Sequence, residues 1–389
     1  MTRPPPNTPQ HTPEELKQLF RGLWREPDST TGLIVRQLDS VQIRAVTWLW
    51  EGWIPLGYTT IWAGETGAGK STVLADVAAR VTTGAPWPGQ TMPRAPGRVL
   101  WLGSEDGIEE MTAPRLLACG ANLKHIVEIQ GTGSRTGKKI FSMQDDISAV
   151  IEHITHNNQR RLDLPPFRLL VIDPITSYLS GTHLRKVDLN DAGQLRTILE
   201  PWFKVANALG IAIVFVTHLN KDTSRSMIHR ILGSSAFVQT CRSLCAVIAR
   251  PEDGMYSKAL MQVKTNLPEH PGGAWKFTTE RFQVGVDEAN GMPIVATRPI
   301  WEELSTELTP DSIIGKERGP VSKYQVSFGI WLQAYFLATP ADQYLPVSEV
   351  KQAAIAEHAA SARWWDEHSG EYLEKVNSNG TWMCRRKDP

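Results

Sequence analysis

The residues Gly64-Glu65-Thr66-Gly67-Ala68-Gly69-Lys70-Ser71 form a pattern that can bind phosphate. The glycines let backbone N–H groups curl around phosphate oxygens, while Lys70 can reach the β and γ phosphates and Ser71 can hold Mg²⁺. The pattern follows a strand-like segment and precedes apolar residues at helical spacing over 71–82, so a helix N-terminus faces the phosphates. ATP and Mg²⁺ are therefore the predicted cofactors. The predicted nucleotide contacts come from Gly64, Glu65, Thr66, Gly67, Ala68, Gly69, Lys70, Ser71 and Thr72.

Asp173 follows a second apolar run, which begins at Phe167. A carboxylate at the tip of a buried strand near a phosphate loop typically binds Mg²⁺ through water. The alternative is that Asp173 caps a helix, a common position for aspartate. The phosphate loop favours the magnesium role, with Ser71 and Asp173 as the metal-site residues.

The base that activates the attacking water does not follow Asp173, because the next residue is Pro174. Glu105 ends another predicted strand and can orient water in line with the γ phosphate, which makes it the predicted general base. Asp106 is the second choice. The alternative for Glu105 is a loop carboxylate that caps the helix beginning at Gly107.

Polar and basic residues follow other predicted strands. His218 closes the segment that begins at Ile211, where it can sense the γ phosphate, although a lone histidine is more often structural. Short basic loops suit contacts with DNA phosphates, and ordinary solvated loops are the alternative. The basic residues of the two loops concerned are Arg185, Lys186, Lys221 and Arg225.

Strand-like and helix-like segments alternate from about residue 58 to 290, which predicts an α/β fold with a mostly parallel sheet covered by helices. The expected parts are a Pro-rich disordered arm over 1–30, a nucleotide-binding domain over 31–304 and a linker over 305–320. The remaining part, 321–389, shows three helical segments and a hairpin turn signal at 377–380, the outline of a winged helix.

Composition limits the possible partners. The 389 residues carry 41 basic and 41 acidic side chains, so nucleic acid can bind only at a local patch. The four cysteines show no metal-binding spacing and fit a reducing cytosol, and Cys241 and Cys245 are expected to be buried thiols. With no signal peptide and no apolar run long enough to span a bilayer, the expected location is the cytoplasm, without membrane contact.

Taken together, the ordered motifs resemble the RecA/DnaB-type P-loop ATPases, and within them the RepA-like replicative helicases of plasmids, phages and mobile elements. The resemblance covers roughly residues 35–290. The segments that carry it, besides the phosphate loop, are Trp48-x4-Trp53-Ile-Pro-Leu-Gly, Leu100-Trp-Leu-Gly-Ser-Glu105-Asp, Val171-Ile-Asp-Pro174, Thr217-His-Leu-Asn-Lys221 and Arg230-x2-Gly-Ser234.

The resemblance implies a RecA-like core and a role in DNA replication, with Glu105 as base and His218 as γ-phosphate sensor. It also implies a homo-oligomeric, often hexameric ring that pulls single-stranded DNA through its centre. Arg242 matches the position of an arginine finger acting on the neighbouring subunit's ATP, and a surface or ion-pair arginine is the alternative. Relatives often have Lys-x-Arg where this chain has Lys264-Thr-Asn266, so only Lys264 could supply a second finger.

Two other functions fit the same motifs. One is a RecA-like recombinase or DNA-stimulated ATPase that does not unwind DNA. The other is an ATP-switched DNA-binding or loading module with slow hydrolysis. For the C-terminal part, DNA binding competes with docking on a primase or initiator, for which the adjacent Trp364 and Trp365 are the expected anchors.

Overall fold

The computed structural model describes residues 38–103, 106–134, 137–189, 191–220, 227–231, 234–250, 257–268 and 272–310, and in the C-terminal part 328, 331–332, 335–336, 343–357, 361–378 and 380–387. The predicted disordered arm over 1–30 lies outside these residues. The chain divides into two compact units, Met1–Gly315 and Lys316–Pro389, and each is described by itself.

A nine-stranded sheet forms the centre of the first unit, in the order β13-β12-β11-β10-β3-β9-β8-β4-β5. The six strands from β10 to β5 run parallel, and β11, β12 and β13 continue the sheet antiparallel. This confirms the predicted α/β fold with a mostly parallel sheet. The strands are β3 Thr59–Gly64, β4 Arg98–Gly103, β5 Ile126–Glu128, β8 Phe167–Asp173, β9 Ala212–His218, β10 Ser243–Arg250, β11 Ser257–Thr265, β12 Ala274–Val286 and β13 Pro293–Ser305.

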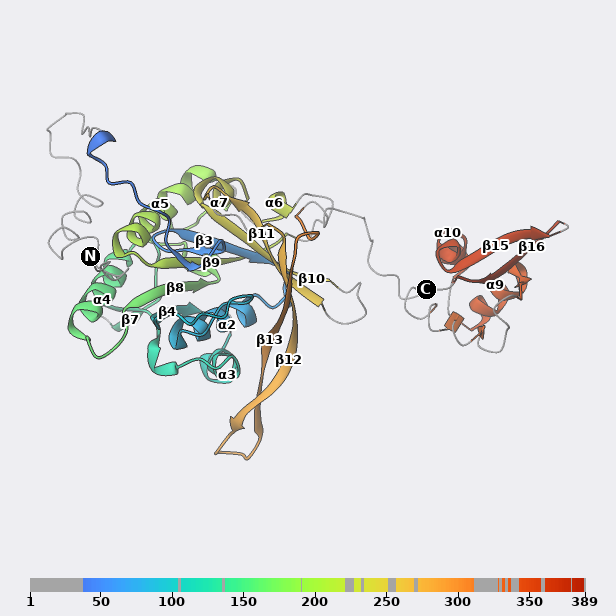
Figure 1. Ribbon diagram of the computed structural model, residues 1–389, viewed down its shortest axis with the longest axis horizontal. Helices are drawn as coiled ribbons and strands as arrows, with labels where there is room; N and C mark the ends of the chain where they lie inside the picture. Colours follow the sequence, from blue (N-terminus) through green and yellow to red (C-terminus); the bar gives the residue numbers. More distant parts are fainter. Residues whose placement is uncertain are drawn as a thin grey trace. The chain divides into compact units, whose positions relative to one another are not determined.

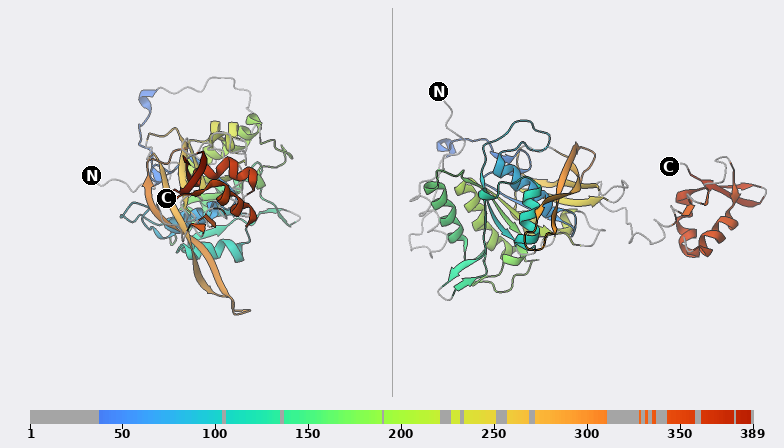
Figure 2. Two further views of the ribbon diagram at one scale, coloured as in Figure 1. Left: turned by 90° about the vertical axis from the view of Figure 1, so that its right-hand side faces the viewer. Right: turned by 90° about the horizontal axis from the view of Figure 1, so that it is seen from below.

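Helices cover both faces of this sheet (Figures 1 and 2). One hydrophobic core joins the sheet to α4, α5 and α7, and a second joins its other face to α2 and α3. No helix within the described residues is both long and apolar enough to cross a bilayer. The helices are α2 Lys70–Thr83, α3 Ala113–Ala118, α4 Ile147–Arg160, α5 Ala192–Leu209, α6 Met227–Arg230 and α7 Ser234–Thr240.

Helix α5 shows how local chemistry sets these boundaries. The Asp191 side chain accepts hydrogen bonds from the backbone N–H groups of Gly193 and Gln194, which caps the helix start. Gly210 ends the helix in a left-handed conformation with φ of 64°, which glycine adopts without steric cost. The predicted bounds of this helix, 192 and 209, are confirmed.

The hairpin of β12 and β13 was not among the predicted strands. No residue of its far half, over 280–286 and 293–298, is buried, so apolar residues such as Phe282, Val284 and Val286 alternate there without a core to face. Figure 1 shows this hairpin projecting from the body of the unit. The hairpin packs on α2 and α3, and near its base Trp301 joins a tryptophan cluster, in which Trp50 stacks on Trp87 and meets Trp301 edge-on.

Short elements complete the first unit. They are β1 Trp48–Trp50, β2 Ile54–Pro55, β6 Thr132–Ser134, β7 Gly137–Lys139, a π-helical turn at Ile108–Thr112 and 3-10 turns at Leu38–Ser40, Leu123–His125 and Ile175–Tyr178.

The second unit has a three-stranded sheet in the order β14-β16-β15 beside two helices. Trp364 and Trp365 are buried in its own core around Phe328, so the expectation that they anchor a partner is wrong: a side chain that fills the core cannot also dock outside. Of the first predicted helix, over 321–337, the described residues Phe328, Trp331, Leu332 and Tyr335 are helical. The other elements are β14 Leu345–Pro346, α9 Val347–Ala356, α10 Ala362–Tyr372, β15 Leu373–Ser378 and β16 Thr381–Arg386.

Candidate nucleotide site

The loop from Gly64 to Lys70 joins the end of β3 to the start of α2. A Cβ atom on Gly64 would lie 2.5 Å from the carbonyl oxygen of Val247, so no side chain fits at this position. Gly69 has φ of +100°, a conformation that L side chains rarely adopt. The two glycines therefore serve the turn itself, and they leave the first backbone N–H groups of α2 available to a phosphate.

Lys70 and Ser71 lie at the start of α2 with their polar atoms in the loop. Lys70 Nζ donates to the carbonyl oxygens of Gly64 and Glu65, at 2.9 and 3.0 Å. Ser71 Oγ lies 3.0 Å from Asp173 Oδ2. A hydroxyl and a carboxylate oxygen, with water, make the hard oxygen set that Mg²⁺ prefers, so these two residues fit the predicted metal site.

Strand register brings the other predicted residues to the same edge of the sheet. Gly64 on β3 pairs with His218 at the end of β9, and Gly103 on β4 pairs with Asp173 at the end of β8. His218 is half-buried there. Glu105 lies outside the described residues, two positions after the end of β4 at Gly103. The carboxyl ends of β3, β4, β8 and β9 thus form one polar edge, called here the carboxyl edge.

Asp106, the second choice for the base, forms an ion pair with Arg115 on α3 at 2.7 Å. The Arg115 side chain is largely buried, with 15% of its surface exposed, so the carboxylate neutralises a cation that water reaches poorly. This contact ties the Asp106 carboxylate to α3. The contact disfavours Asp106 as base.

Arg242 and Lys264 lie at the opposite edge of the sheet. Ser243, the residue after Arg242, pairs with Thr60 at the beginning of β3, and Lys264 pairs with Leu244. Gly64 lies four positions after Thr60 on β3, which is about 13 Å at the usual rise of a strand. Arg242 is exposed, whereas Lys264 Nζ donates to the carbonyl oxygen of Val238 on α7.

One of the two predicted DNA-contact loops is described. Gln144 fixes its backbone by donating to the carbonyl oxygens of Leu179 and Leu184 and accepting from the Leu184 N–H. Arg185 and Lys186 are both exposed on this anchored loop. Lys221 and Arg225 of the other loop lie outside the described residues.

Two cationic residues beside the phosphate loop were not predicted. Arg230 forms an ion pair with Glu65 at 2.6 Å. Lys258 Nζ lies 3.5 Å from where a Cβ of Gly69 would be, and burial lowers the pKa of this amine. Lys258 could have been predicted from the sequence. It lies at the start of β11, and a strand that follows β10 and pairs with it antiparallel must begin at the carboxyl edge. The pairing of Arg230 has no signal in the sequence.

A parallel α/β sheet with a glycine-rich loop, a lysine and a serine–aspartate pair at its carboxyl edge defines a P-loop nucleotide-binding protein. A protein-family model described as AAA domain matches residues 20–224, more than half of the chain. The chain belongs to this family of P-loop ATPases, so its first unit is a nucleotide-binding, ATP-hydrolysing domain. A search of curated proteins finds no match to the chain.

Proposed function

We propose that the protein is a ring-forming, RepA/DnaB-like replicative helicase, which couples Mg²⁺-dependent ATP hydrolysis to translocation on single-stranded DNA. The observation that carries this proposal is the separation of two charged sites on one sheet. Lys70, Ser71 and Asp173 lie at the carboxyl edge, and Arg242 lies exposed beyond the other edge.

The proposed reaction is in-line attack of water on the γ phosphate. Lys70 turns from the Gly64 and Glu65 carbonyl oxygens to the β and γ phosphates, and the N-terminus of α2 contributes its positive end. Ser71 and Asp173 would hold Mg²⁺, which would supply positive charge to the phosphate oxygens. Glu105 accepts the proton of the attacking water, and His218 contacts the γ phosphate from the neighbouring strand.

The position of Arg242 supports a ring. At about 13 Å or more from the level of Gly64, its guanidinium cannot reach the phosphates of its own chain. An exposed arginine at that edge can meet the nucleotide of a second copy, where its planar fork suits the charge of a phosphoryl group in transfer. We therefore propose a homo-oligomer, hexameric by its resemblance to ring helicases.

The proposed DNA contacts are local. Arg185 and Lys186 stand exposed on a loop that follows β8, and Lys221 and Arg225 would add to them from the loop after β9. We further propose that the second unit is a winged-helix-like module that docks on a primase or initiator. Two basic groups that could contact DNA phosphates are engaged within the unit, which favours a protein partner over DNA. Arg385 pairs with Glu374, and Lys387 donates to the Gly370 carbonyl.

The decisive test is ATP hydrolysis with and without single-stranded DNA, for wild type and Glu105→Gln. We expect strong stimulation by DNA in the wild type. In Glu105→Gln, turnover should fall by about 10²- to 10⁴-fold, the usual contribution of a general base, while ATP still binds. The matched control is Glu109→Gln, the same chemical change at an exposed position nearby, which should behave as wild type.

Each outcome decides part of the proposal. Hydrolysis indifferent to DNA would overturn the helicase function and leave an ATPase of another kind. Normal turnover in Glu105→Gln would remove Glu105 as the base. Stimulation by DNA without strand separation in an unwinding assay would favour a DNA-stimulated ATPase that does not unwind.

A further inference from the structure

Lys258 is a second lysine beside the phosphate loop, and it comes from a strand far from that loop in the sequence. It lies at the start of β11, which runs antiparallel to β10 and therefore begins at the carboxyl edge. Pairing with Ala249 on one side and with Phe277 on the other fixes its backbone in the sheet. Its Nζ lies 3.5 Å from the position that a Cβ atom of Gly69 would occupy, so the amine lies against the last glycine of the loop.

The position beside Gly69 determines which phosphate groups this amine can meet. In a P-loop, the backbone N–H groups cradle the α and β phosphates, and the loop lysine reaches the β and γ phosphates. Lys70 Nζ donates to the carbonyl oxygens of Gly64 and Glu65, the first two residues of the loop. Lys258 borders the last glycine instead, and its flexible side chain lets the ammonium group turn toward the cradle. The two lysines thus approach the loop from its two ends.

The charge of Lys258 is not balanced by the chain itself. Gly69 immediately precedes α2, where the helix dipole is positive and a further cation is unfavourable. Burial lowers the pKa of the Lys258 amine, and no carboxylate of the described residues lies close enough to counter this effect. Arg230, another cation beside this loop, is by contrast paired with Glu65 at 2.6 Å. An anion at the loop would supply the counter-charge of Lys258, and a nucleotide phosphate is such an anion.

We propose that Lys258 contacts the α and β phosphates of a nucleotide bound to its own chain, as a second phosphate-binding lysine beside Lys70. This inference deepens the nucleotide-binding part of the proposed function and rests on that part alone, since it involves neither DNA nor a second subunit. Because ADP and ATP share these two phosphates, Lys258 contributes equally to the binding of both. Lys70, which also reaches the γ phosphate, contributes more to the binding of ATP than of ADP.

The first test measures the affinity of the full chain for ADP and for a non-hydrolysable ATP analogue, each with Mg²⁺, by calorimetry. Lys258→Met keeps most of the length of the side chain and removes its charge. We expect it to weaken the binding of both nucleotides by a similar factor of at least about tenfold, the lower end of what a hydrogen bond to a charged group contributes. Lys258→Arg keeps the charge and should recover most of the loss. Lys204→Met, the same change at an exposed position of α5, is the control and should bind as wild type does.

A second readout separates a phosphate contact from a structural role. A lysine whose charge the chain does not balance adds little to stability, so Lys258→Met without nucleotide should unfold at the same urea concentration as wild type or at a higher one. ADP at one fixed concentration should then raise the unfolding midpoint of wild type more than that of the variant, because the wild type binds ADP more tightly.

Labelling of the wild type gives a third test, which needs no variant. An amine-reactive N-hydroxysuccinimide ester should modify Lys258, and peptide mass spectrometry measures the rate. ADP with Mg²⁺, at about ten times the dissociation constant, should slow this reaction about tenfold, because only about one site in eleven is then free. Lys204 should be modified at the same rate with and without ADP.

The outcomes separate the inference from the function on which it rests. A wild type that binds neither ADP nor the ATP analogue would overturn nucleotide binding, and the inference with it. Normal ADP affinity in Lys258→Met, or a loss confined to the ATP analogue, would overturn the inference alone. So would labelling of Lys258 that ADP leaves unchanged. A lower unfolding midpoint of Lys258→Met without nucleotide would show that the lysine serves the fold instead.

Discussion

The two edges of the parallel sheet carry different chemistry. At the carboxyl edge the polar groups face one another, as the 3.0 Å contact between Ser71 and Asp173 shows, and Lys70 is only 8% exposed. At the opposite edge Arg242 is exposed, and the Asn266 N–H donates to its carbonyl oxygen, so backbone contacts hold its position while the guanidinium faces solvent. One edge therefore gathers its polar groups against one another, and the other presents a charge to solvent.

The largest effect that this comparison predicts is that of Arg242→Ala. A finger acting in trans contributes about 10³- to 10⁵-fold to turnover, so we expect a loss of at least about a thousandfold with ATP affinity nearly unchanged. The measurements are steady-state hydrolysis and equilibrium binding of a fluorescent ATP analogue.

Mixing experiments separate this role from a local one. Subunits carrying Arg242→Ala, mixed with subunits carrying Lys70→Ala, should regain activity, because a mixed interface can combine one intact P-loop with one intact finger. Arg196→Ala on α5 is the control, since this exposed arginine lies elsewhere on the unit. Unchanged turnover in Arg242→Ala would show that Arg242 is an ordinary surface arginine with no part in hydrolysis. The main support for the ring would then be lost.

At the carboxyl edge, Asp173→Asn keeps the shape of the side chain and removes its charge. Residues that orient or support a metal typically change its affinity by about 10- to 100-fold. We expect turnover to fall by about this factor at low Mg²⁺ and to recover partly as Mg²⁺ is raised, measured as the Mg²⁺ concentration for half-maximal hydrolysis. A loss that Mg²⁺ does not relieve would contradict the metal role, since the Ser71–Asp173 contact would then be structural.

The sequence predicted what local chemistry encodes and missed what long-range packing decides. The phosphate loop, the strand ends at Asp173 and His218, and helix α5 follow from glycines, caps and apolar periodicity. The β12–β13 hairpin was missed although Phe282, Val284 and Val286 stand at alternate positions, because its far half faces no core that would make this pattern decisive. The ion pair of Arg230 with Glu65 joins residues 165 positions apart, and no rule of spacing connects them. The burial of Trp364 and Trp365 depends in the same way on neighbours distant in the sequence.

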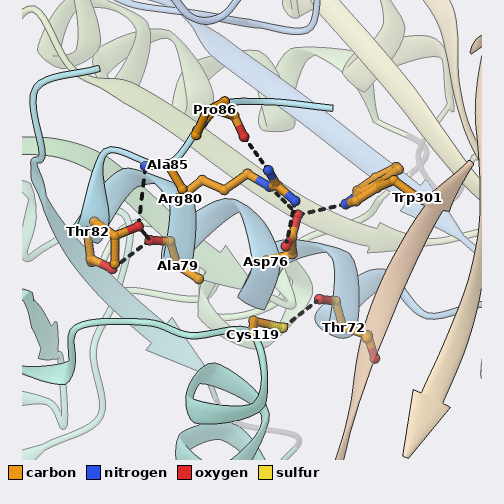
Figure 3. A network of polar contacts seen from close by, with 10 residues as sticks. Thr72, Asp76, Ala79, Arg80, Thr82, Ala85, Pro86, Cys119 and Trp301 are labelled. Atoms are coloured by element: carbon orange, nitrogen blue, oxygen red, sulfur yellow. Dashed lines mark hydrogen bonds and ion pairs between the residues drawn. The ribbon is translucent and has the colours of Figure 1, made fainter. Parts of the chain in front are cut away.

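The difference between the edges also depends on how α2 is held, because this helix carries Lys70 and Ser71. Figure 3 shows Asp76, in the middle of α2, accepting hydrogen bonds from Arg80 on the same helix and from Trp301 on β13. Asp76 is 6% exposed, and Arg80 also donates to the Pro86 carbonyl. A second contact, between Thr72 Oγ1 and Thr297 Oγ1 at 3.4 Å, lies one turn nearer to the loop.

Trp301→Phe tests this anchor. The change keeps a ring in the cluster but removes the N–H donor to the Asp76 carboxylate, and hydrogen bonds to charged groups contribute about 1.5 to 3 kcal/mol. We expect the free energy of unfolding of the first unit to fall by that amount, measured by urea denaturation. The control is Trp382→Phe, at an exposed position of β16 in the second unit, which should change the free energy of unfolding by about 0.5 kcal/mol or less. Equal effects of the two changes would show that the hairpin does not anchor α2.

The smallest predicted effect concerns Cys241, the buried neighbour of Arg242. Burial raises the pKa of this thiol from 9.0 to about 12, despite the opposing influence of Lys264 and Arg242. Only the thiolate reacts, and its fraction at pH 8 is then about a thousandfold lower than for an unperturbed thiol. Cys241 should therefore resist iodoacetamide in the native protein and react readily in urea, as peptide mass spectrometry can measure.

Because pH 7 to 9 lies well below the raised pKa, the slow native reaction should increase about tenfold per pH unit. Rapid labelling of native Cys241 would mean that the backbone at this edge opens in solution, and an edge that opens could not hold Arg242 in place for a neighbouring subunit.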